Sequence, residues 1–180
     1  MKPQELSAVD IQVPSEENVA RILSKEWFVR GKLTSAAFAL EQGESYLSVN
    51  RSAIDTYDSD VAMFVRNHNS YAFDENSYKR ALLNVGDVRG IDVKVNQVEM
   101  KIDVEIEPRD THTKSHAGIF TRFHDKNIKK GQLLKVAPTA KEVSGDAILL
   151  EVRKELKSLS SVEECKIVEA APLDGSMASY

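Results

Sequence analysis

Alternation of apolar and charged residues between Val98 and Glu107 constrains the fold of this chain more than any other feature. Along this stretch every second residue is apolar, and a charged residue occupies each position between. The apolar positions are Val98, Met100, Ile102, Val104 and Ile106, and the charged ones are Glu99, Lys101, Asp103, Glu105 and Glu107. Because successive side chains of a β-strand point to opposite faces of its sheet, the pattern predicts a strand with one buried and one wet face. Half-solvated strands are typical of antiparallel sheets.

The pattern changes phase at Asn96 and Gln97, because Val93 and Val95 precede it in the opposite register. A β-bulge or a tight turn would accommodate that change, and we favour a hairpin. Pro108 ends the strand, since it has no N–H to donate to a neighbouring strand.

The clearest helical pattern lies between residues 146 and 159. Its apolar stripe at helical spacing consists of Ile148, Leu149, Val152, Leu156 and Leu159. Such a helix would pack on the apolar face of the sheet. The sequence therefore predicts an α+β fold, with a mostly antiparallel sheet of about five to seven strands, this C-terminal amphipathic helix and one or two shorter helices packed on it.

Shorter patterns predict the remaining elements. Residues 16–25 and 58–67 each carry a short apolar stripe at helical spacing after a residue suited to cap a helix, so both predict short helices. The apolar run around Leu82 and Val85 fits a buried strand or the end of a helix, and we favour a strand. Residues 162–168 predict an edge strand.

Length and composition predict one soluble domain. A chain of 180 residues can bury its own core, and we assign the domain to residues 1–170 and a flexible tail to 171–180. No apolar run approaches the roughly 18 residues that cross a bilayer, and the N-terminus lacks the pattern of a secretory signal. The single cysteine, Cys165, excludes an internal disulfide and fits a cytoplasmic location.

Residues 25–51 combine Trp27 and Phe28, Gly31, the run Ser-Ala-Ala-Phe and the run Tyr-Leu-Ser-Val-x-Arg. This pattern resembles a segment of small bacterial proteins of unknown function. The resemblance suggests a bacterial protein, and it implies no activity and no functional residue.

A basic segment, residues 109–135, stands out in an acidic protein. It has seven Lys or Arg against two Asp, a local charge of +5 in a chain of net charge −4. This asymmetry predicts that the segment meets an anionic ligand or protein partner, although a solvated surface gives the same pattern. Nucleic acid is the less favoured partner, and the sequence leaves the oligomeric state open. The candidate binding residues are Arg51, Arg122, Lys126, Lys129 and Lys130; for Arg51 a surface ion pair is the alternative.

Three histidines, His112, His116 and His124, lie in or near this segment with Asp110. Imidazole is a common zinc ligand, and three ligands can form a catalytic metal site. However, the H-x3-H spacing follows a proline-terminated strand, where a helix is not expected, and no H-E-x-x-H motif is present. We therefore predict no metal site and no cofactor.

His116 is the candidate catalytic residue, because it leads into the apolar run at 117–120 and its ordinary pKa suits proton transfer. The alternative is a structural histidine whose hydrogen bonds are satisfied. Ser48 and Ser35 are the candidate nucleophiles, but neither belongs to a G-x-S-x-G motif. Since no catalytic motif is complete, we favour a binding domain over the alternative, a small enzyme with His116 as general acid or base on an anionic substrate.

Overall fold

The computed structural model describes residues 12–40, 44–95, 98–100, 102–109, 113–123, 133–136 and 141–168; at 98, 123, 133–136 and 141–145 only the backbone is described. Its centre is a six-stranded antiparallel sheet in the order β12-β5-β1-β4-β9-β8. The strands are β1 (Asn18–Leu23), β4 (Leu47–Arg51), β5 (Ser77–Asn84), β8 (Ile102–Pro108), β9 (His116–Phe123) and β12 (Ser161–Lys166). The predicted α+β fold is thereby confirmed.

Helices and short strand pairs complete the described part of the chain. The α-helices are α1 (Tyr57–Asn67), α2 (Val85–Arg89) and α3 (Gly145–Leu159), so the C-terminal helix and the helix near 58–67 are confirmed. The 3-10 helices are η2 (Lys25–Trp27), η3 (Ser35–Phe38) and η4 (Asn69–Tyr71). The two-stranded pairs are β2 (Phe28–Val29) with β3 (Lys32–Leu33), β6 (Lys94–Val95) with β7 (Val98–Glu99), and β10 (Leu133–Val136) with β11 (Lys141–Ser144).

The alternating segment forms two strands, β7 at Val98–Glu99 and β8 from Ile102, where its pattern predicts one. In β8, Val104 and Ile106 are buried, while Asp103 on the opposite face is exposed. The preceding β6 and β7 pair antiparallel, with Lys94 opposite Glu99, which confirms the hairpin. The turn residues 96 and 97 lie outside the described residues.

The predicted helix at 16–25 is wrong, because Asn18–Leu23 form β1, a central strand between β4 and β5. Val19 and Leu23 are buried on one face and Ala20 and Ile22 on the other. A strand buried on both faces has no polar alternation, so its apolar run imitates a short helical stripe. The strand favoured around Leu82 is present as β5, but the chain continues from Val85 as the short helix α2.

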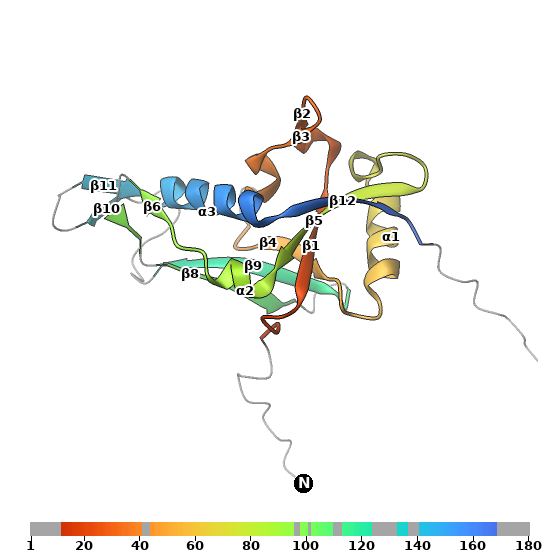
Figure 1. Ribbon diagram of the computed structural model, residues 1–180, viewed down its shortest axis with the longest axis horizontal. Coiled ribbons are helices and arrows are strands. Elements are labelled where there is room, and N and C mark those ends of the chain that lie inside the picture. Colours follow the sequence, from red (N-terminus) through yellow and green to blue (C-terminus); the bar gives the residue numbers. More distant parts are fainter. Residues whose placement is uncertain are drawn as a thin grey trace, which may run out of the picture.

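Two apolar clusters lie on opposite faces of the sheet. On one face, α3 contributes Ile148, Val152 and Leu156 to the main core, together with α2 and η3. On the other face, α1 packs Val61 and Val65 against β1 and β5. Figure 1 shows α3 along the sheet beside η3, and α1 standing close to β5 and β12. Because α1 packs on β1 and β5, it does not cover β4 and β9. It borders the part of the same sheet face that these two strands form.

Polar side chains anchor α1 to the sheet. Arg80 of β5 donates a hydrogen bond to the Tyr57 hydroxyl of α1 at 3.1 Å and pairs with Glu163 of the edge strand β12 at 3.0 Å. Burial first, and then the neighbouring Tyr57 hydroxyl, raises the pKa of Tyr78 above its ordinary value of 10.0, so this phenol stays protonated. The hydrogen bond from Arg80 to Tyr57 holds α1 against the sheet.

Candidate functional site

A cavity of about 350 Å³ lies between α1 and the adjoining face of the sheet, and we call it the α1 cleft. This volume is within the range of small-molecule sites, about 300–1,000 Å³. Its polar lining includes Arg21, Ser48, Asn50, Asp60, His68 and His116. Apolar side chains of α1 and the ring of Tyr71 form the rest of the wall. The cleft therefore combines an apolar body with several convergent polar groups.

His116 and Ser48 face each other in this cleft. The register pairs Ser48 with Gly118 and Asn50 with His116, which places Ser48, Asn50 and His116 on the same face of the sheet. His116 Nε2 lies 3.4 Å from Ser48 Oγ, at the long end of hydrogen-bonding distance. Of the two predicted nucleophiles, Ser48 lies beside His116, whereas Ser35 belongs to η3 and is not part of the cleft lining.

Arg21 places a positive charge beside the cleft, and no sequence motif pointed to it. Strands β1 and β4 pair only at Val19–Arg51 and Ala20–Asn50, and Arg21 bridges the point where they part. Its Nη1 donates to the Ser48 carbonyl at 2.8 Å and its Nε to the Ala37 carbonyl at 3.2 Å. Two backbone carbonyls thus fix this guanidinium at the gap between β1 and β4.

A small buried network holds His116 in place at the start of β9. Ser115, which is completely buried, donates its backbone N–H to Asp60 Oδ2 at 3.1 Å and accepts a hydrogen bond from Asn50 Nδ2 at 3.0 Å. Asp60 also accepts a hydrogen bond from Thr56 at 2.9 Å. The Asp60 carboxylate therefore has a structural function, joining α1 to the turn before His116.

Beyond the cleft, the same sheet face carries a cluster of arginine and aromatic side chains. The ring of Tyr46 lies 5.1 Å from that of Phe120 and 6.0 Å from that of His116. The Arg109 guanidinium lies over both rings, 4.9 Å from Tyr46 and 5.5 Å from Phe120, and Arg122 lies 5.2 Å from Phe120. We call Tyr46, Arg109, Phe120 and Arg122 the arginine–aromatic face.

The charge of Arg109 has no acidic partner among the described residues. Glu107 forms an ion pair with Arg122, and Glu105 forms one with Arg89 at 3.0 Å. The Nε atom of Arg109 is buried and has no hydrogen-bond partner within the described part of the chain. An unpaired buried donor is costly, so Arg109 is the group on this face whose hydrogen bonding the described residues leave incomplete.

The predicted site residues do not all come together. Arg51 forms a two-point ion pair with Glu17, at 2.6 and 3.0 Å, and it alternates in β4 with Asn50, so it faces away from the cleft. An ion pair of this kind is the alternative that the sequence left open to anion binding by Arg51. Arg122 lies on the arginine–aromatic face, whereas His116 lies in the cleft beside it. Lys126, Lys129 and Lys130, like His112 and His124, lie outside the described residues.

Comparisons with known proteins do not assign the chain to a family: no family model, curated protein or solved structure matches it. In the part of the chain that the structure describes, no helix is long and apolar enough to cross a bilayer. The same residues include no cluster of three or more histidine, cysteine or acidic side chains that could hold a metal ion. The cleft and the arginine–aromatic face are therefore the features of the described residues that bear on function.

Proposed function

We propose that this protein is a binding domain that takes an anionic partner on its arginine–aromatic face. The observation that carries the proposal is Arg109, a guanidinium stacked on two rings without an acidic partner in the described residues. Arg109 opens the basic segment 109–135, so the proposal joins the charge asymmetry of the sequence to one side chain.

The surroundings of Arg109 suit recognition of phosphate or carboxylate. A guanidinium presents a planar fork of donors that matches either group, and stacking on rings fixes the plane of that fork in advance. Arg122 is exposed and close by, while its pairing with Glu107 limits the acidic charge on the same face. Pre-orientation lowers the entropic cost of binding. The lysines of the basic segment would add charge attraction.

Replacement of Arg109 by glutamine tests this proposal. We expect binding of an anionic probe to weaken by about tenfold or more, the effect of losing a charge-assisted hydrogen bond. The probes are a labelled oligothymidylate for phosphate and a labelled oligoglutamate for carboxylate, followed by fluorescence anisotropy over a range of salt concentrations. If the oligothymidylate binds, the slope of log affinity against log salt should fall by about 0.7 in the variant.

Arg66→Gln is the matched control, because Arg66 is an exposed arginine of α1 and its loss changes the net charge equally. It should leave both the affinity and the salt slope close to those of the wild type. Equal losses in the two variants would show that only overall charge matters. Absence of binding to both probes at low salt would refute an anion-binding face.

A second candidate function is catalysis in the α1 cleft, and the 3.4 Å contact between His116 and Ser48 favours it. Here His116 would accept the Ser48 proton as the hydroxyl oxygen attacks the substrate. Turnover of p-nitrophenyl acetate and p-nitrophenyl phosphate should then fall about 10²- to 10⁴-fold in folded His116→Ala, with a comparable loss in Ser48→Ala. Unchanged turnover in folded His116→Ala removes the catalytic alternative.

We also propose a cytoplasmic location in a bacterium. The support is the single cysteine, Cys165, and the resemblance of residues 25–51 to small bacterial proteins. Fractionation of cells that express the tagged full chain tests it, and recovery in a membrane or secreted fraction would contradict it.

A further inference from the structure

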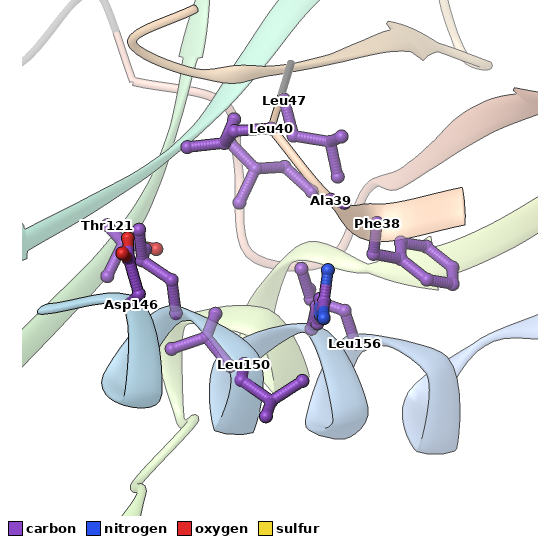
Figure 2. Close-up of a pocket in the computed structure, with 12 residues that line it drawn as sticks. Phe38, Ala39, Leu40, Leu47, Thr121, Asp146, Leu150 and Leu156 are labelled. Atoms are coloured by element: carbon purple, nitrogen blue, oxygen red, sulfur yellow. The ribbon is translucent and has the colours of Figure 1, made fainter. Parts of the chain in front are cut away.

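A second cavity, of about 330 Å³, lies between α3 and the edge formed by η3, β4 and β9, and we call it the α3 pocket. Figure 2 shows Leu40 and Leu47 facing Leu150 and Leu156 across it, with Asp146 and Thr121 at one end and Phe38 at the other. The pocket lies on the α3 side of the sheet, whereas the α1 cleft lies on the opposite side. It is therefore separate from the proposed anion-binding face.

Two charged side chains, Asp146 and Arg153, stand among the apolar residues that line this pocket. Arg153 belongs to the lining, and its Nε atom is fully buried and unpaired within the described part of the chain. Asp146 does not compensate it, because seven residues of helix separate the two by about 10 Å along α3. A buried guanidinium donor that lacks an acceptor is unfavourable, so an acceptor from outside the described chain would be stabilising.

We propose that the α3 pocket binds a small amphipathic carboxylate. The carboxylate accepts hydrogen bonds from the Nη atoms of Arg153, which lines the pocket, because the two oxygens of a carboxylate match the planar guanidinium. The hydrocarbon chain lies between Leu40 and Leu47 on one side and Leu150 and Leu156 on the other. Asp146, at the far end, disfavours a second acidic group there, so the ligand is a monocarboxylate.

The volume of the pocket sets the size of this ligand. An engineered apolar cavity of about 150 Å³ holds benzene, which has six carbons. The α3 pocket has roughly twice that volume, so it fits a chain of roughly eight carbons. Octanoate is therefore the probe, and 1-octanol, which has the same chain without the charge, is its matched neutral control.

Isothermal titration calorimetry of the full chain tests the proposal. The wild type should bind octanoate at millimolar or lower concentration, and about tenfold or more tightly than 1-octanol. Arg153→Met keeps the length and apolar volume of the side chain but removes its charge, so octanoate affinity should fall about 10- to 100-fold while 1-octanol affinity is retained. Arg66→Met, at an exposed position of α1, should leave both affinities unchanged.

A pocket-filling variant provides an independent test. Ala39 lines the pocket. Ala39→Leu should abolish binding of both probes, because the larger side chain fills the space that the hydrocarbon chain of the ligand would occupy. Octanoate binding that survives Ala39→Leu, or equal affinities of octanoate in the wild type and Arg153→Met, would overturn the proposal, as would no octanoate binding by the wild type. If Arg153→Met does not fold, Ala39→Leu alone decides the result.

Discussion

Replacement of Ile106 by alanine is expected to lower the free energy of unfolding by about 2–5 kcal/mol. Ile106 is completely buried in the main core, where β8 lies at the edge of the sheet. Removing its side chain loses the transfer free energy of three carbons and leaves a cavity that the surrounding strands fill only in part. Urea-induced unfolding followed by circular dichroism measures the change.

Val162→Ala is the control for this prediction, since Val162 also lies in an edge strand but is 45% exposed. We expect a change within about 0.5 kcal/mol there. Similar effects in the two variants would mean that β8 does not insert its apolar face into the core. The alternation from Val98 to Glu107 would then not indicate a strand with one buried face.

Gly118→Val is expected to destabilise the fold by about 3 kcal/mol, the upper end of the usual cost of overpacking. A Cβ at Gly118 would lie 2.5 and 2.8 Å from two ring atoms of Tyr46 and 3.0 Å from Phe120. Valine is otherwise favoured in strands, so an open site would tolerate or prefer it. The destabilisation therefore reports the packing of Tyr46 directly over β9.

The displaced ring also links this variant to function, because Tyr46 supports the Arg109 guanidinium. Gly118→Val should weaken anion binding as well as stability. Gly90→Ala is the control, since its Cβ would meet nearest atoms at 3.5 and 3.6 Å, ordinary contact distances. A neutral or stabilising Gly118→Val would contradict the described arrangement of Tyr46, Phe120 and Arg109.

Elements with one solvent-exposed face and one buried face could be predicted from the sequence. The alternation from Val98 predicted β8, and the stripe from Ile148 predicted α3, because each element has one polar face that reveals its period. β1 could not be predicted in this way, since both of its faces are buried and its apolar residues follow no clear period. Its identity depends on pairing with β4 and β5, which are distant in the sequence.

The site was predictable only in part. The positive charge of residues 109–135 predicts anion binding by the segment that contains Arg109. His116 and Ser48 are candidates as a base and a nucleophile, each from its own part of the sequence. Their proximity depends on the register of β4 and β9, which the sequence does not reveal. Arg21 and Tyr46 were missed because no local motif distinguishes them. The pairing of Arg51 with Glu17 likewise depends on tertiary structure.

The central claim is that the Arg109 guanidinium contacts an anionic partner, and the ¹⁵N NMR resonance of the Arg109 Nε–H group tests it most directly. The resonance is assigned by its absence from Arg109→Gln and is followed during titration with oligothymidylate and with oligoglutamate. We predict that the probe that binds shifts this resonance and slows its exchange with water, together with shifts of β9 amides around Phe120. Binding that leaves the Arg109 resonance unchanged and shifts other parts of the protein would contradict the proposed site.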